Sequence, residues 1–275
     1  MYTETEDLVP DVIAKAQRGL NISDLELESL ANISSGELAA VKKLHKNTSH
    51  KDLKKIAQAL QLNESGLIAL ADGWLPEQVS LNGLKQIPSP YYGAFVNAYV
   101  VWDPASLEAF IFDTGMDAHP ILQFIKDNGL RPKALFLTHA HTDHIACLPP
   151  LQRAFKNIPT YIHENEALSA AKSFKSLHLK FENIEITSKL TPGHSPGGTT
   201  YLIQGLERPI AIVGDALFAG SQGGTGSVHY KEALDNNKRE IFSLTDNTIL
   251  CPGHGPLSTV REEKRYNCFY LPASQ

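Results

Sequence analysis

Thr138-His139-Ala140-His141-Thr142-Asp143-His144 contains four metal-binding side chains within six residues. It directly follows residues 134–137, an apolar run that predicts a buried strand. Packed this closely without a cation, three imidazoles and a carboxylate would put potentially like-charged groups side by side. Imidazole and carboxylate ligands together suit zinc, iron or manganese. The stretch therefore predicts a metal site at the end of a strand.

Three isolated residues further along the chain complete the candidate set of ligands. His194 lies in TPGHSPGG, Asp215 follows the apolar run 210–213, and His254 lies in LCPGHGP. Each position is at the end of an apolar segment or among glycines and prolines, where loops carry functional side chains on a rigid scaffold. The candidate ligands are His139, His141, Asp143, His144, His194, Asp215 and His254.

These side chains are expected to form two groups, because four ligands within six residues cannot all reach one ion from a strand end. The first two histidines of HAHTDH would face one ion, and its aspartate and last histidine a second. His194 would complete the first group, His254 the second, and Asp215 would bridge both ions. Two ions about 3.5–4 Å apart can hold a hydroxide between them and polarise a carbonyl or phosphoryl oxygen. The pattern predicts a hydrolase with two Zn²⁺ per chain, or alternatively iron or manganese, acting on a small-molecule substrate.

Length and composition limit the other classes of protein. A chain of 275 residues fits one large domain or two domains. No apolar stretch approaches the roughly 20 residues of a membrane span, and the acidic start MYTETEDLVPD is unlike a secretory signal. Three cysteines, an odd number at unrelated spacings, argue against a disulfide framework. We expect a cytoplasmic protein without a membrane partner.

The sequence pattern divides the chain into two parts, the first helical and the second mixed. Residues 1–78 have helical periodicity and a capping box at Ser23 and Glu26. Strand-like runs begin near residue 84 and alternate with helical runs. We predict an α+β protein in which a small all-α domain (1–78) precedes a mixed domain (79–275). Helices are expected over 9–16, 23–31, 35–46, 49–60 and 64–70, and strands over 95–102, 109–112, 134–137, 159–162, 184–187, 199–203, 210–213 and 248–251.

The order HAHTDH, PGHSPGGT, VGDALF and PGHG resembles the metallo-β-lactamase superfamily, and FDTG (112–115) resembles that family's first motif. The resemblance covers roughly residues 84–270. TPGHSPGGTTY, GDALFAGS and CPGHGPLSTVREEKRYN look most like the glyoxalase II (hydroxyacylglutathione hydrolase) branch in its short form. The resemblance implies an αββα sandwich with the site at one edge of the sheets. It also implies thioester hydrolysis by a metal-bound hydroxide that Asp143 orients.

One segment departs from the glyoxalase II pattern. Related proteins usually continue after GDALFAGS with a Gly-Arg-Thr-Asp-like segment, whereas this chain has Gln222-Gly223-Gly224-Thr225-Gly226-Ser227. Glycines replace the arginine and the aspartate. The sequence therefore predicts a flexible, uncharged loop without the fixed cation that a carboxylate-bearing substrate requires.

Residues 12–70 resemble helix-turn-helix domains of the phage-repressor type. The resemblance rests on GLNISDLELESLANISSGELAAVKKL followed by LKKIAQALQLNESGLIAL. It implies a recognition helix over residues 35–46, in which Lys42, Lys43 and Lys46 are candidate phosphate contacts. Residues 1–80 nevertheless carry more acidic than basic side chains, unlike a typical DNA binder. A docking or dimerisation module, giving a homo-oligomer, is the alternative to DNA binding.

Two other functions compete with a dinuclear thioester hydrolase. An iron enzyme of the persulfide dioxygenase kind would use His139, His194 and Asp215 as a facial triad around one ion. A DNA-binding regulator would use the metallohydrolase part to sense a ligand. The full set of candidate ligands favours an enzyme over a sensor, and the ratio of metal to protein distinguishes the two enzymes.

Overall fold

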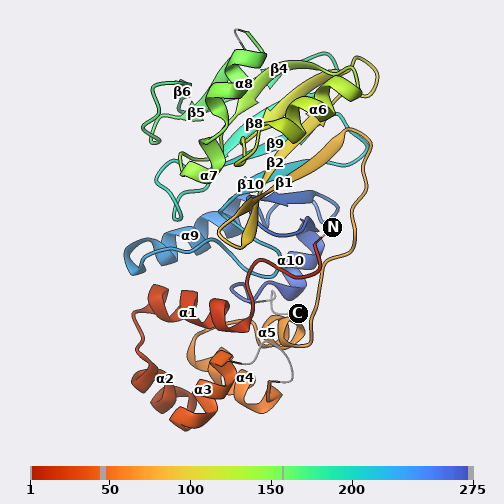
Figure 1. Cartoon of the computed structure of the whole chain (residues 1–275). Coiled ribbons are helices and arrows are strands. Elements are labelled where there is room, and N and C mark those ends of the chain that lie inside the picture. The colour runs from red at the N-terminus through yellow and green to blue at the C-terminus, as the bar shows by residue number, and fades with distance from the viewer. Residues whose placement is uncertain (1, 44–47, 157, 272–275) are drawn as a thin grey trace.

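The computed structural model describes residues 2–43, 48–156 and 158–271. Two six-stranded sheets pack face to face, with helices on both outer faces (Figure 1). The first sheet, in spatial order, consists of β1 (Leu84–Tyr91), β2 (Ala94–Trp102), β3 (Glu108–Phe112), β4 (Arg131–Phe136), β5 (Thr160–His163) and β6 (Lys172–Phe174). The second sheet consists of β12 (Ser258–Thr259), β11 (Ile249–Pro252), β10 (Ile210–Gly214), β9 (Thr199–Gln204), β8 (Glu185–Leu190) and β7 (His178–Lys180). The predicted αββα sandwich is confirmed.

Aromatic side chains fill the space between the two sheets. The rings of Phe112 and Phe136 stack with centroids 5.1 Å apart, and Tyr201 of the facing sheet lies 5.3 Å from Phe136. Every residue of β10 is buried, because the other sheet covers one face of the strand and helices cover the other. This double burial explains why β10 reads as a continuous apolar run in the sequence.

Helices complete the outer layers. On the first sheet, α6 (His119–Asp127) and α8 (Leu148–Ala154) supply Ile121, Ile125, Leu148 and Leu151 to one core cluster. On the second sheet lie α9 (Ser227–Glu240) and α10 (Val260–Tyr266). The short α7 (Thr142–Ile145) follows β4 and lies beside β2 of the first sheet. The N-terminal helices are α1 (Val9–Leu20), α2 (Asp24–Ala31), α3 (Ser35–Lys43), α4 (His50–Ala59) and α5 (Glu64–Ala71).

The five N-terminal helices lie close to the expected positions. Ser23 accepts from the backbone N–H of Glu26 at 3.3 Å, and the Glu26 carboxylate accepts from the backbone N–H of Ser23 at 2.8 Å, as the capping box predicts. The recognition helix expected over 35–46 is described as far as Lys43, and Lys46 lies outside the described residues. Strands β1, β6, β7 and β12 had not been expected from the sequence.

The N-terminal helices share a hydrophobic core with the second sheet. Val12 and Leu67 belong to the same buried cluster as Leu217, Tyr230 and Phe269. Figure 1 shows these helices gathered beside α9 and α10. The helices pack against one another, and the core that they form continues without a break into the second sheet. The boundary at residues 78 and 79 stays a prediction.

Two close approaches join the helical part to the rest of the chain. Gly19 of α1 lies so close to α9 that a Cβ there would be 2.2 Å from Cδ2 of Tyr230. At the start of α5, the Asn63 side-chain amide donates to the carbonyls of Arg265 and Asn267, each at 3.1 Å. These contacts fix both α1 and α5 against the C-terminal half of the chain.

All three cysteines are free and buried. Within the described ranges, no helix combines the length and apolar character needed to cross a membrane.

Candidate metal centre

The candidate ligands meet at one edge of the sandwich because of strand direction. β3 and β4 run parallel in the first sheet, as do β10 and β11 in the second. Parallel strands end at the same edge, so Asp215 after β10 and His254 after β11 become neighbours. HAHTDH follows β4 and leads into α7, and His194 lies in the connection from β8 to β9.

The structure brings the seven predicted side chains together in the expected grouping. One group contains His139, His141 and His194, a second contains Asp143, His144 and His254, and a third set contains His139, His144 and Asp215. Within each set the potential ligand atoms all lie within 4.8 Å of one another. That these side chains bind metal remains a prediction.

Asp215 lies between the two groups. Its Oδ1 is 3.3 Å from Nε2 of His144, and its Oδ2 is 3.4 Å from Nε2 of His194 and 3.6 Å from Nε2 of His254. One carboxylate thus faces imidazoles from both groups, which is the position expected of a bridging ligand.

Hydrogen bonds behind the centre turn four imidazoles towards it. Nδ1 of His139 lies 3.0 Å from Thr138 Oγ1, and Nδ1 of His144 lies 2.8 Å from Asp113 Oδ2. Nδ1 of His194 lies 3.0 Å from the Gly224 carbonyl, and Nδ1 of His254 lies 2.9 Å from the Phe95 carbonyl. These acceptors place the proton on Nδ1, which leaves the Nε2 lone pair facing inwards. Metal-binding histidines generally have such outer partners.

Unpartnered buried atoms support a cation at this position. His139 Nε2, His144 Nε2 and Asp215 Oδ1 are buried without a hydrogen-bond partner. A buried polar atom without a partner is costly, and these three atoms all accept rather than donate when the imidazoles are neutral. Cations held by the two groups would satisfy all three atoms, because His139 belongs to the first group, His144 to the second, and Asp215 lies between them. The donor set fits zinc, iron or manganese.

The electrostatics of the cluster also suit a cation. Burial and the neighbouring His144 lower the pKa of His139 well below its usual value. Burial raises the pKa of Asp215, but His144 and the other imidazoles outweigh it and hold that carboxyl well below its usual range. Burial opposes protonation of His144, yet Asp113 and Asp215 raise its pKa well above the ordinary value. A metal ion must displace that proton, so metal affinity should fall with acidity.

Two carboxylates support the centre from behind, and sequence reasoning assigned neither of them this role. Asp113 of FDTG accepts from the backbone N–H and the hydroxyl of Thr138, at 2.7 and 2.8 Å, as well as from His144. Glu166 accepts from the backbone N–H groups of Ala140 and Gly197, at 2.9 and 2.7 Å, and so joins two ligand-bearing loops. Only the motif around Asp113 gave a signal in the sequence.

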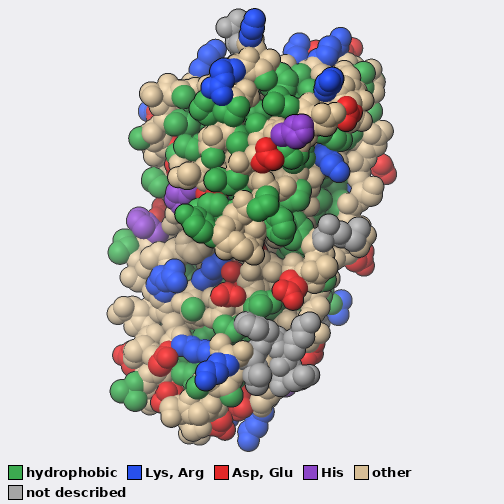
Figure 2. Space-filling model, in the orientation of Figure 1, with side chains coloured by type: hydrophobic (Ala, Val, Ile, Leu, Met, Phe, Trp, Pro, Cys, Tyr) green, Lys and Arg blue, Asp and Glu red, His purple; other side chains and the backbone are tan. Residues whose placement is uncertain are grey.

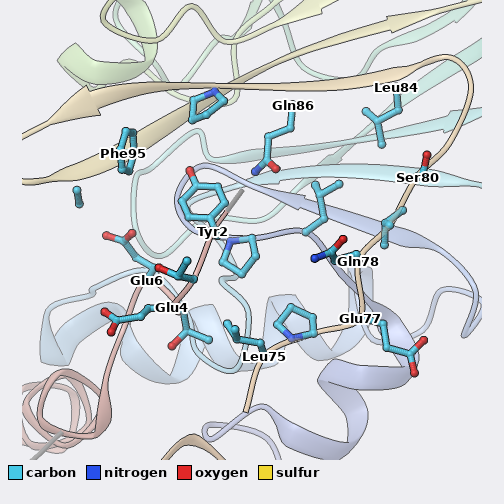
Figure 3. Close-up of a pocket in the computed structure, with 18 of the residues that line it drawn as sticks. Tyr2, Glu4, Glu6, Leu75, Glu77, Gln78, Ser80, Leu84, Gln86 and Phe95 are labelled. Atoms are coloured by element: carbon cyan, nitrogen blue, oxygen red, sulfur yellow. The ribbon is translucent and has the colours of Figure 1, made fainter. Parts of the chain in front are cut away.

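A larger pocket lies on the other side of His254. Its volume is about 880 Å³, and none of the seven candidate ligands lines it. Figure 3 shows Tyr2, Glu4 and Glu6 of the N-terminal segment on one side and Gln86 and Phe95 on another. Two residues of its lining reach the centre: the Phe95 carbonyl lies 2.9 Å from Nδ1 of His254, and the Glu6 carboxylate lies 4.0 Å from the same nitrogen.

The lysines proposed as phosphate contacts receive no support. Lys42 forms an ion pair with Asp24, and Lys43 is exposed. Glu37 lies in the first turn of α3, and its carboxylate accepts from the Ser34 backbone N–H at 2.6 Å, which forms a second capping box. The exposed side of α3 therefore carries the Glu37 carboxylate and small side chains as well as Lys43, and DNA binding stays an untested prediction.

Comparisons with known proteins agree with this geometry. The model of the metallo-beta-lactamase superfamily matches residues 91–254. The probable metallo-hydrolase YqgX of Bacillus subtilis is 32% identical over 186 residues, which cover 59% of this chain and 87% of that protein. The hydroxyacylglutathione hydrolase GloC of Haemophilus influenzae is 26% identical over 202 residues, covering 63% and 92%. The crystal structure of the BLEG-1 B3 metallo-beta-lactamase has a TM-score of 0.59 and 32% identity, covering 67% and 97%.

Proposed function

Because the chain belongs to the metallo-beta-lactamase superfamily, we propose that it is a dinuclear metal-dependent hydrolase of glyoxalase II type, which cleaves a thioester. The observation that carries the dinuclear assignment is the pair of ligand groups with Asp215 between them. A single-ion oxygenase would need only His139, His194 and Asp215. It would leave the group of Asp143, His144 and His254 without a purpose. The similarity to hydroxyacylglutathione hydrolase GloC and the motifs after β8, β10 and β11 support the thioester as the bond cleaved.

When bound, two divalent cations would polarise the thioester carbonyl and lower the pKa of a water molecule. The chain itself must hold and orient that water. Asp143 is placed for this task, because its Oδ2 lies 3.2 Å from His254 Nε2 within the cluster. Burial raises the pKa of Asp143, but the hydrogen bond with His254 and the charges of His144 and His254 together outweigh this effect and lower it. The carboxylate is therefore ionised at neutral pH and can accept a proton from the attacking water.

Tyr91 stands at the rim of the same group. The nearby negative charge of Asp143 raises the pKa of the Tyr91 hydroxyl, and its ring centroid lies 6.4 Å from that of His254. A hydroxyl that keeps its proton in this position can donate to a substrate oxygen. In the overall reaction water adds to the carbonyl carbon, the carbon–sulfur bond breaks, and a carboxylic acid and a thiol are released.

Metal analysis and a thioester assay test the proposal together. Protein purified without added metal should contain two equivalents of zinc, or of iron or manganese, and should release thiol from an acyl thioester. Removal of the metal with a chelator should abolish turnover, and addition of Zn²⁺ should restore it. One equivalent of iron, with oxygen consumption and no thioester cleavage, would favour the oxygenase instead. A β-lactam belongs in the substrate panel because of the similarity to BLEG-1.

A further inference from the structure

Arg18 lies in the last turn of α1, and its side chain is exposed. Within the described ranges, no hydrogen-bond acceptor or carboxylate pairs with its guanidinium. One terminal nitrogen of the group would lie 3.6 Å from a Cβ built on Gly224. A free guanidinium thus lies directly beside the glycine-rich loop that follows Asp215. On the face shown in Figure 2, Lys and Arg side chains gather over the junction of α1 and α9.

The same loop connects Arg18 to the metal centre. The carbonyl of Gly224 accepts from Nδ1 of His194 at 3.0 Å. On the neighbouring residue, a Cβ built on Gly223 would lie 3.1 Å from that same nitrogen. Only one loop residue therefore separates the guanidinium from a candidate metal ligand.

Contacts from α1 hold this loop in place. Lys15 donates to the carbonyl of Gln222 at 2.8 Å and pairs with Asp7, which also accepts from the Ser221 hydroxyl. Gln222 is 2% exposed, and its side chain accepts from the Tyr270 hydroxyl at 2.8 Å. The first residues of the predicted flexible loop are thus anchored, because the helical part packs against them.

The charge of Lys15 is already neutralised by Asp7, so Arg18 is the cation of α1 that remains available. The loop itself, from Gln222 to Ser227, contains no charged residue. α9 begins at Ser227, and no side chain caps its first turn. The helix dipole therefore adds positive potential at the end of the same loop. An anionic group is the ligand that suits this position.

We propose that Arg18 is a specificity-determining residue that binds a carboxylate carried by the substrate of the metal centre. The proposal rests on the proposed function, and it makes the N-terminal helical part a wall of the active site. A planar guanidinium binds a carboxylate through two parallel hydrogen bonds. Helix α1 thus supplies the cation that the glycine-rich loop does not contain. The preferred substrate is a thioester with a carboxylate on its acyl or thiol half.

A matched pair of substrates tests this role. The carboxylate substrate is an acyl thioester of 3-mercaptopropionate, and the neutral control is the thioester of its methyl ester. Arg18→Ala should raise KM about tenfold to a hundredfold for the carboxylate substrate. It should leave kcat, metal content and the kinetics of the methyl ester unchanged. Arg18→Lys should recover part of the preference. Arg153→Ala removes an exposed arginine of α8 and should have no effect.

Binding measured by calorimetry gives a second readout that does not require turnover. The ligands are the thioethers that correspond to the two substrates, added to metal-loaded protein. Wild-type protein should bind the carboxylate thioether more tightly than its methyl ester, and Arg18→Ala should abolish this preference. An unchanged preference in a folded Arg18→Ala variant overturns the role of Arg18 and leaves hydrolysis untouched. Failure of the wild type to cleave either thioester overturns the proposed function, while the binding preference still decides on Arg18.

Discussion

Replacing Asp113 with asparagine tests whether the carboxylate behind the centre orients two imidazoles. Asp113 Oδ2 accepts from Nδ1 of His144 at 2.8 Å and from the Thr138 hydroxyl at 2.8 Å, and that hydroxyl lies 3.0 Å from Nδ1 of His139. Its Oδ1 accepts from the Thr138 backbone N–H at 2.7 Å. An asparagine has one oxygen and one NH₂ group, so one of these donors must meet another donor.

The expected size of the effect follows from these contacts. A buried hydrogen bond to a charged group contributes about 1.5–3 kcal/mol. Loss of a partner that orients a metal-binding histidine weakens metal affinity about 10–100-fold, which corresponds to about 1.4–2.7 kcal/mol. Because the two estimates overlap, we expect Asp113→Asn to weaken binding of the ion held by His144 by a factor in this range.

Competition with a chromophoric chelator measures this affinity directly. Asp127→Asn is the matched control, because Asp127 is exposed at the end of α6. Circular dichroism should show that both variants are folded. If Asp113→Asn binds both ions with wild-type affinity, the hydrogen bonds do not orient the imidazoles as described, and the inferred positions of the Nδ1 protons are wrong.

Three further substitutions probe the centre and the packing around it. Asp143→Asn should lose most thioester turnover and bind the second ion more weakly; wild-type turnover at full metal content would show that Asp143 has no catalytic role. Gly19→Ala should lower the free energy of unfolding by about 1–3 kcal/mol through its clash with Tyr230, although alanine favours a helix by about 1 kcal/mol. Urea titration measures this free energy. Gly36→Ala on exposed α3 is the control and should be neutral or stabilising. If both glycine variants lost the same free energy of unfolding, the docking of α1 on α9 would be contradicted. Burial raises the pKa of Glu263 from 4.5 to about 7, so the folded chain keeps a proton that the unfolded chain releases. The free energy of unfolding should therefore decrease by up to about 3 kcal/mol as pH rises through this window. Glu263→Gln should remove this contribution from the difference in the free energy of unfolding between pH 5 and pH 8. If that difference stayed as in the wild type, the burial of a protonated carboxyl would be contradicted.

The sequence predicted the candidate ligands because their chemistry is local. HAHTDH is a contiguous motif, and His194, Asp215 and His254 each lie in a short pattern with its own glycines or prolines. The central strands were predicted for a similar reason, since burial on both faces produces long apolar runs. Strands β6, β7 and β12 contain three residues or fewer, which is too short for periodicity to appear.

The supporting contacts could not be predicted, because they depend on tertiary packing. Nothing local to Glu166 indicates that it joins Ala140 to Gly197. In the same way, the glycines after Gln222 indicate flexibility, and only the packing of α1 against the loop shows that Gln222 is anchored. A pattern describes what a segment can do alone, whereas these residues act through partners far away in the sequence.

The docking of the first helices onto the last ones has a consequence for the order of folding. Asn63 donates to carbonyls more than two hundred residues later, and Gly19 packs on Tyr230. Helices of this length form within microseconds, but their partners in α9 and α10 are synthesised only after most strands of the sandwich. The part of α1 that packs on α9, including Gly19, must therefore stay exposed until α9 has been synthesised. We expect the nascent chain to depend on chaperones in this interval, and the closing of this long loop to be a late step in folding.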